Sequence, residues 1–95
     1  MQKYQCVNID ESNGIYQLQG VFDKFMIPQQ WKEIQGLFKT VAPKVIDLAG
    51  IESSDSALIA LLVEMKREYS VISIINAPEN LVQLLDLYQV KTLLF

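Results

Sequence analysis

Residues 45–67 constrain the fold of this chain more than any other stretch. They begin with a short apolar run at 45–48, continue through a polar turn at 52–55, and end in a segment that is apolar on nearly every side. The apolar run predicts a buried strand. Asp55 predicts the start of a helix, because its carboxylate can accept hydrogen bonds from the first backbone N–H groups, which have no partner inside the helix. Ser56 then lies in the first turn, at the positive end of the helix dipole.

A helical wheel at about 100° per residue gives the segment after Asp55 two apolar sides. One broad side is expected to face the core and carries Ala57, Leu58, Leu61, Leu62 and Met65. The opposite side carries Ser56, Ile59, Ala60, Val63 and Arg67, with Lys66 beside them. A surface helix is normally polar on its outer side. The wheel alone leaves two interpretations open: a neighbouring helix of the same domain covers this side, or a protein partner docks on it.

The start of the chain predicts a hairpin. Strands at 4–9 and 15–19 flank Asn13 and Gly14, two residues that tolerate positive φ and favour a tight turn. Residues 20–26, which follow the second strand, are expected to form a loop.

An amphipathic helix is predicted after this loop. Pro28 suits its first turn, where a missing backbone N–H is tolerated. Apolar residues recur at helical spacing, with polar residues between them: Ile27, Trp31, Ile34 and Phe38. The phase of Trp31 favours core burial over a role at an interface. Gly36 weakens the helix by up to about 1 kcal/mol relative to alanine, unless a neighbour packs closely against it.

The last third of the chain predicts a strand and a helix. Residues 71–75 are expected to form a second buried strand, because continuous β-branched runs between helices indicate strands that are covered on their faces. Asn76 and Glu79 fit a capping box, with the asparagine as the cap of a third helix. The apolar residues of that helix are Leu81, Leu84, Leu85 and Tyr88. Residues 91–95 are predicted to supply a terminal strand.

Together these elements predict a single α/β domain over residues 1–95. Their order is strand, strand, helix, strand, helix, strand, helix, strand, which predicts a mixed β-sheet with right-handed crossovers and three main helices packed against it. Three apolar stripes must be covered on a small sheet, so we expect one-sided or uneven coverage. The order of the strands within the sheet does not follow from this pattern.

Composition narrows the class of function. The chain has 95 residues, of which 51% are hydrophobic, and this suits one compact domain. The formal charge of -3 comes from interspersed acidic and basic residues, which argues against a nucleic-acid surface. Without histidine or a glycine-rich phosphate motif, and with one cysteine, the usual zinc sites, the commonest general base and nucleotide cradles are missing. We expect no enzyme, no cofactor and no metal site.

The amino terminus and the single cysteine favour a reducing cytoplasm. Residues 1–6 lack the apolar core of a signal peptide, and Cys6 cannot form an internal disulfide. Cys6 is interpreted as a small apolar strand residue. No apolar run approaches the ~20 residues needed to span a bilayer. We therefore expect no direct membrane insertion, and membrane association only through a partner.

Ser56 has two chemical interpretations. As a structural residue it supports the helix start together with Ser53 and Ser54, an ordinary role for hydroxyl groups. As a switch it would place a phosphate where the helix amides and dipole stabilise negative charge. Chemistry alone favours the structural role. Asp23 and Lys24, in the loop before the first helix, are interpreted as solvated charges rather than partner contacts.

Several of these residues resemble a known family. The strand V-I-D-L, the polar turn and the helix start D-S-A-L-I-A-L-L resemble the STAS domain, which is shared by anti-sigma-factor antagonists and some transporter components. The run G-V-F-D at 20–23 is similar to the family's G-E-L-D turn, and the likeness extends over nearly the whole chain. Within the family, Trp31, A-L-I-A-L-L and L-L-D-L-Y-Q-V resemble the small cytoplasmic subunits of phospholipid-transport ABC complexes in Gram-negative bacteria.

The resemblance implies a non-enzymatic protein that binds an ABC ATPase subunit and, through it, an inner-membrane permease. By position, Ser56 matches the family's serine or threonine at the helix start, which is phosphorylated in the sigma-regulating branch and contacts the ATPase in the transporter branch. The implied contact comprises Asp55, Ser56, Ile59, Ala60, Val63 and Arg67. Ala57 and Leu58 replace the Ser-Gly pair of the phospho-switch pattern D-S-S-G, which favours constitutive docking. The alternative is an anti-sigma-factor antagonist regulated by phosphorylation at Ser56.

Overall fold

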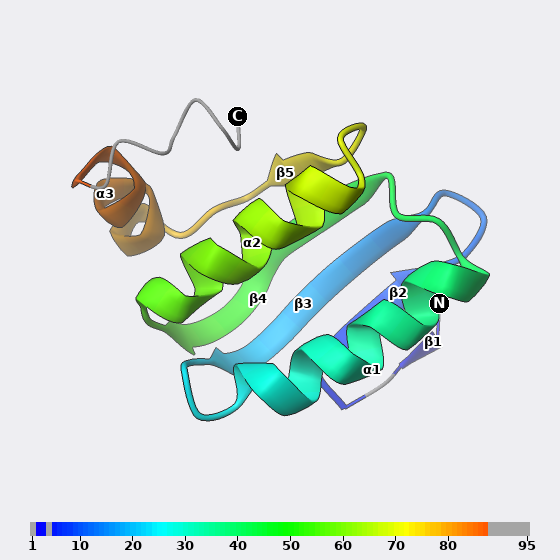
Figure 1. Ribbon diagram of the computed structural model, residues 1–95, viewed down its shortest axis with the longest axis horizontal. Coiled ribbons are helices and arrows are strands. Elements are labelled where there is room, and N and C mark those ends of the chain that lie inside the picture. Colours follow the sequence, from blue (N-terminus) through cyan, green and yellow to red (C-terminus); the bar gives the residue numbers. More distant parts are fainter. Residues whose placement is uncertain (1, 4, 88–95) are drawn as a thin grey trace.

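The computed structural model describes residues 2–3 and 5–87. Its elements in chain order are β1 (Gln2–Lys3), β2 (Val7–Asp10), β3 (Ile15–Phe22), α1 (Ile27–Thr40), β4 (Val45–Ser54), α2 (Ser56–Glu68), β5 (Ser73–Ile75) and α3 (Glu79–Leu87). In Figure 1, α1 and α2 lie side by side over one face of the sheet, and α3 lies next to the end of α2 where that helix begins. The described part is an α/β domain, as the sequence predicts.

The sheet has the strand order β1-β2-β3-β4-β5. β1, β2 and β3 pair in antiparallel fashion, whereas β3, β4 and β5 are parallel neighbours. The register aligns four buried residues in one row across the sheet: Ile9, Tyr16, Ile46 and Ile74. Because alternate residues of a strand point to opposite faces, this row marks the face that receives the helices. The predicted mixed sheet is confirmed, and the strand order simply follows the chain.

The opposite face of the sheet is more polar. Asn8, Gln17 and Asp47 are neighbours in register on β2, β3 and β4, and all three are only half-buried. Figure 1 shows α1 and α2 on the other face. The two central helices thus cover one side of the sheet, in line with the expected one-sided arrangement.

α1 is the predicted amphipathic helix. It buries Ile34 and Phe38 against the sheet. The ring of Phe38 makes edge-on contacts with the rings of Tyr16, Trp31 and Tyr69, with centroid distances of 4.8, 5.9 and 5.2 Å. Trp31 is partly buried and packs against the core, as its helical phase predicts.

The predicted opening strand at 4–9 is wrong in its extent, because the chain bends before β2. β2 begins at Val7, and β1 folds back on it as an antiparallel neighbour. Cys6 lies in the bend rather than in a strand, although its side chain is buried. A hydrogen bond from Gln19 N to Cys6 O, 2.9 Å long, ties the bend to β3. Tyr4 lies outside the described residues.

The predicted hairpin between β2 and β3 is confirmed, but its turn occupies residues 11–14 rather than Asn13 and Gly14 alone. Gly14 has a φ of 64°, in the left-handed region that favours glycine. A Cβ at this position would lie 2.9 Å from Ala42 O, and Gly14 O accepts a hydrogen bond from Lys44 N at 2.8 Å. Gly14 therefore allows the turn to pack directly against the connection between α1 and β4.

β3 and β4 are both longer than predicted. Residues 20–22, expected to begin a loop, continue β3, and residues 52–54, expected to be a turn, continue β4. Phe22 pairs with Ser54 at the end of the two strands, and its side chain is fully buried. Parallel pairing between the strands therefore overrides the polar character of 52–54. As a result, Asp55 directly connects β4 to α2.

The predicted strand at 71–75 is shortened to β5, and Val71 lies 77% exposed in the turn after α2. The prediction that Asn76 caps α3 is also wrong. Asn76 has a φ of 57°, and its Nδ2 donates to Asp47 Oδ1 at 3.0 Å. Pro78 O, not the Asn76 side chain, accepts hydrogen bonds from the first turn of α3, namely from Leu81 N and Val82 N at 3.0 Å each. Asparagine tolerates the left-handed conformation, so it serves here as the link between β5 and α3.

α3 itself matches the predicted third helix. Leu81 and Leu85 are fully buried, and Leu84 packs against the same core. The predictions for Tyr88 and for a strand at 91–95 fall outside the described residues.

Candidate functional site

The junction between β4 and α2 is held by the carboxylate of Asp55. Its Oδ1 accepts a hydrogen bond from Ala57 N at 2.8 Å, so the predicted helix cap is confirmed. Its Oδ2 accepts from Lys24 N at 3.0 Å, a contact between residues 31 positions apart in the chain. One side chain thus joins the start of α2 to the loop between β3 and α1.

That loop is built around Asp23. Its Oδ1 accepts hydrogen bonds from Phe25 N and Met26 N, each at 3.0 Å, and its backbone carbonyl accepts from Ile27 N at 2.9 Å. Lys24 Nζ lies 5.2 Å from the centroid of the Phe25 ring. Asp23 is therefore a structural residue of the turn into α1, not the freely solvated charge that its loop position predicts.

Large apolar side chains are exposed on this fixed loop. Phe25 is 79% exposed and Met26 is 42% exposed. Ser56 and Ala60, one helical turn apart on α2, are exposed as well. We call this group the loop–helix surface: Phe25, Met26, Asp55, Ser56 and Ala60. Exposed apolar residues bordered by polar groups are typical of protein contact sites.

Of the residues predicted to contact a partner on α2, the structure leaves some exposed and buries others. Asp55 is half-buried, Ser56 and Ala60 are exposed, and Arg67 is exposed near the far end of the helix, where it pairs with Glu64. Val63 is only partly exposed and packs against the core. Within the described residues, no hydrogen bond involves the Ser56 hydroxyl, so the cap depends on Asp55.

The prediction that Ile59 contacts a partner is wrong, because its side chain is buried. It is 6% exposed and belongs to the same buried cluster as Leu81 and Leu85 of α3. Both α1 and α3 contact α2, and the burial of Ile59 shows that part of the second apolar side is covered within the domain. A helical wheel gives only the angle of a residue around its own axis and cannot show these neighbours. The exposed residues of the predicted contact are Ser56 and Ala60 near the start of the helix and Arg67 near its far end.

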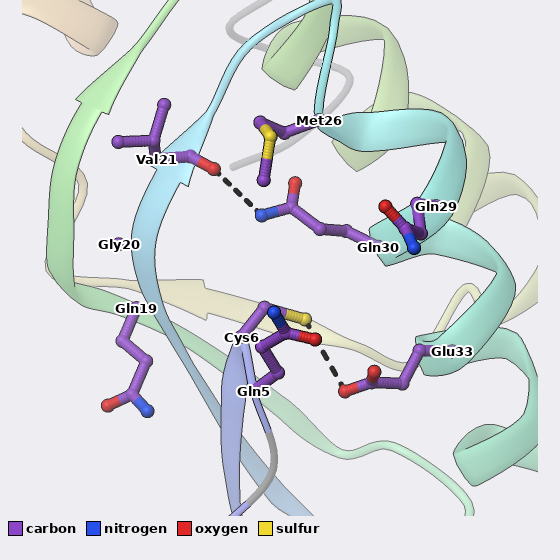
Figure 2. Close-up of a pocket in the computed structure, with 9 residues that line it drawn as sticks. All are labelled: Gln5, Cys6, Gln19, Gly20, Val21, Met26, Gln29, Gln30 and Glu33. Carbon is purple, nitrogen blue, oxygen red and sulfur yellow. Dashed lines mark hydrogen bonds between the residues drawn. The ribbon is translucent and has the colours of Figure 1, made fainter.

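A pocket of about 250 Å³ lies on the other side of the same loop. It is lined by Gln5, Cys6, Gln19, Gly20, Val21, Met26, Gln29, Gln30 and Glu33 (Figure 2), and we call it the glutamine pocket. Gln30 is only 9% exposed. Its Nε2 donates to Val21 O at 2.7 Å, whereas its Oε1 is buried and has no hydrogen-bond partner among the described residues.

The sulfur of Cys6 donates a hydrogen bond to Glu33 Oε1 at 3.7 Å in this pocket. Burial, followed by the negative charge of Glu33, raises the pKa of the Cys6 thiol to about 12. The thiol is therefore protonated at neutral pH, which makes it a weak hydrogen-bond donor and a poor nucleophile.

The sequence pattern does not reveal the glutamine pocket. In the sequence, Gln30 is one of several polar residues between the apolar positions of α1. Its sequence neighbours do not distinguish it from Gln29 or Gln35. The exposed pair Phe25 and Met26 was detectable as two apolar residues in a predicted loop. That their loop is joined to the start of α2, however, depends on the hydrogen bond from Lys24 N to Asp55.

Within residues 2–3 and 5–87, no helix is long and apolar enough to cross a membrane. The same residues contain no group of three or more histidine, cysteine, aspartate or glutamate side chains arranged to hold a metal ion.

Comparison of the sequence with models of known protein families and with curated proteins finds no match. The likeness to the STAS family is therefore a prediction carried by the motifs quoted above.

Proposed function

We propose that this chain is a non-catalytic, STAS-like subunit of an ABC-type phospholipid transport complex, most like MlaB of the Mla system. In this role it binds the ATPase subunit and supports its assembly with an inner-membrane permease, so that it is cytoplasmic and peripheral to the membrane. The motifs at Asp55 and Ser56 and the A-L-I-A-L-L run of α2 support this function.

The observation that carries the proposal is the double hydrogen bond of the Asp55 carboxylate. It holds the loop between β3 and α1, which carries the exposed Phe25, at the start of α2, where Ser56 is exposed, so both lie on segments joined by one side chain. A preformed surface loses little conformational entropy when a partner binds. Exposed aromatic residues also tend to supply much of the binding energy at protein interfaces.

Co-purification with the ATPase tests the proposal. The tagged chain is co-expressed with an ABC ATPase and permease of the Mla type, and the ATPase retained on the resin is quantified. We expect the wild type to retain the ATPase, and Ser56→Glu and Ala60→Asp to reduce retention at least about tenfold, since each places a charge in the contact. Both side chains are exposed, so neither change disturbs the core.

Ser70→Glu is the matched control, because Ser70 is exposed in the turn at the other end of α2. It should retain the ATPase like the wild type. Val63→Asp is a poor test, because Val63 packs against the core and its loss would destabilise the domain. Equal retention by all the folded variants, or no retention by the wild type, would reject the proposed surface.

The second candidate is an anti-sigma-factor antagonist switched by phosphorylation of Ser56. The exposed Ser56 hydroxyl favours it, because this group lies in the first turn of α2, where the helix dipole stabilises a phosphate. Mass spectrometry after incubation with a kinase encoded near the gene should then detect phosphoserine at this position. If Ser56 stays unmodified and the chain retains the ATPase, the anti-sigma-factor antagonist is rejected and the transport subunit is the remaining candidate.

A further inference from the structure

Gln30 is the starting point for a second site, which shares Met26 with the loop–helix surface. Its amide is buried and oriented by one hydrogen bond, from Nε2 to Val21 O, but its Oε1 accepts none within the described residues. A buried carbonyl oxygen without a donor is unfavourable, and such groups in folded proteins are generally paired with protein, water or a ligand. The position therefore calls for a hydrogen-bond donor.

A flexible side chain lies on the side of this oxygen. In Figure 2 the Gln30 amide oxygen points toward Met26, and both residues line the glutamine pocket. Methionine is unbranched and adapts easily to new surroundings, and Met26 is already 42% exposed. Rotation of this side chain toward solvent would open a path from the pocket to Gln30 Oε1 without removing a residue from the core.

The charge of the pocket indicates the kind of donor. Among the described residues, Glu33 is the one lining residue with a charged side chain, and the hydrogen bond found for its carboxylate is that from the weakly donating thiol of Cys6. Both Gln30 Oε1 and the Glu33 carboxylate are hydrogen-bond acceptors. A molecule that satisfies both must carry N–H or O–H groups, and a positive charge would strengthen its interaction with Glu33.

We propose that the glutamine pocket binds a small molecule that carries a primary amine. The ammonium donates to Gln30 Oε1 after Met26 moves aside, and the Glu33 carboxylate compensates its charge. The volume of about 250 Å³ restricts the ligand to a small molecule, since it is slightly below the usual range of ligand pockets.

Titration followed by NMR tests this proposal with propan-1-amine as the probe, because its ammonium group is its only hydrogen-bond donor. We expect saturable shifts at the side-chain amide of Gln30 and at the backbone amides of Val21 and Met26. The N,N,N-trimethyl derivative of the probe has the same charge but no N–H donor on nitrogen. It should bind at least about tenfold more weakly, because it cannot satisfy Gln30 Oε1.

Two variants locate the site. Glu33→Gln should weaken binding of the amine about tenfold, because it removes the compensating charge, and Gln30→Met should abolish the saturable shifts. Glu68→Gln, an equal change of charge at an exposed position of α2, should bind like the wild type. The spectra also show whether each variant is folded, and Glu33→Gln remains a test if Gln30→Met is not.

Several outcomes would overturn the proposal. These are shifts that do not saturate, equal binding of the amine and its trimethyl derivative, or a crystal structure with the probe present in which only water contacts Gln30 Oε1. The glutamine pocket contains neither Ser56 nor Ala60. Rejection of amine binding in this pocket would therefore not reject the proposed ATPase contact at Ser56 and Ala60.

Discussion

The loop–helix surface and the glutamine pocket border the same loop but differ in how their polar groups are hydrogen-bonded. At the loop–helix surface, both oxygens of Asp55 are hydrogen-bonded while the apolar ring of Phe25 is exposed. In the glutamine pocket, the amide oxygen of Gln30 is buried without a hydrogen-bond partner in the described part of the chain, and the thiol of Cys6 is paired with Glu33. A rigid surface with exposed apolar area suits a protein partner, whereas a concave site with an unsatisfied acceptor suits a small donor.

The largest effect that tests this contrast concerns Cys6. Its pKa is raised from 9.0 to about 12, first by burial and then by the charge of Glu33. At pH 8 we expect iodoacetamide to alkylate the native protein at least about a hundredfold more slowly than the chain unfolded in urea, because each pKa unit lowers the thiolate fraction about tenfold. Mass spectrometry at timed intervals measures both rates.

The same shift gives a pH dependence of stability. The folded state favours the neutral thiol of Cys6. The contribution of this thiol to the free energy of unfolding is therefore fully present below pH 9 and is lost as the pH rises from 9 toward 12. Glu33→Gln should accelerate native-state alkylation but leave it slower than in the unfolded chain, because burial is the larger cause. Alkylation as fast in the native as in the unfolded protein would show that the pocket is not closed around Cys6.

The next effect concerns the Asp55 carboxylate. Asp55→Ala removes the cap of α2 and the link to Lys24 N. We expect the free energy of unfolding in urea to fall by about 2 kcal/mol, from loss of the cap and of one further hydrogen bond. Asp55→Asn, which keeps an acceptor oxygen for the cap, should lose less than half as much. Equal losses in the two variants would indicate that the carboxylate does not hold the loop through both oxygens.

Phe25→Ala separates stability from binding. The Phe25 ring is 79% exposed, so the free energy of unfolding should change by less than about 0.5 kcal/mol. Binding to the purified ATPase, measured by calorimetry, should weaken about tenfold. Val71→Ala is the matched control, because Val71 is 77% exposed but lies in the turn at the far end of α2. If the two variants bind equally well, Phe25 is not part of the contact.

The smallest effect is expected on the outer side of α1. Gly36 is exposed, and a Cβ added there would have no heavy atom within 4 Å. Gly36→Ala should therefore raise the free energy of unfolding by about 0.5–1 kcal/mol and leave both sites unchanged. Gly14→Ala should do the opposite, because Gly14 has a φ of 64° and lies close to Ala42 O. Urea unfolding of the two variants measures both changes, and a destabilised Gly36→Ala would contradict the open position.

Local patterns were sufficient to predict much of the framework. The core residues of α1, such as Ile34 and Phe38, follow from helical spacing, and the cap at Asp55 follows from the chemistry of a single side chain. The errors occur where distant segments meet. Residues 52–54 look like a turn but pair with β3, and Asn76 looks like a cap but bonds to Asp47 on β4.

The candidate sites show the same division. Ser56 and Ala60 were expected on the outer side of α2, and both are exposed. Ile59 was expected beside them, but it is buried in the cluster that includes residues of α3. Gln30 was indistinguishable from the other glutamines of α1, because its burial depends on β3 and Met26 rather than on its own sequence neighbours.

The sequence by itself determined the α/β class, the helical faces and the helix start at Asp55, because periodicity and capping act over a few neighbouring residues. Only the tertiary structure decided that Lys24 N bonds to Asp55, that Ile59 is buried in the core, and that Gln30 Oε1 is buried without a hydrogen-bond partner among the described residues. The physical reason is that hydrogen bonding and burial at these positions join residues far apart in the chain. Their partners exist only once the sheet and its helices are packed together.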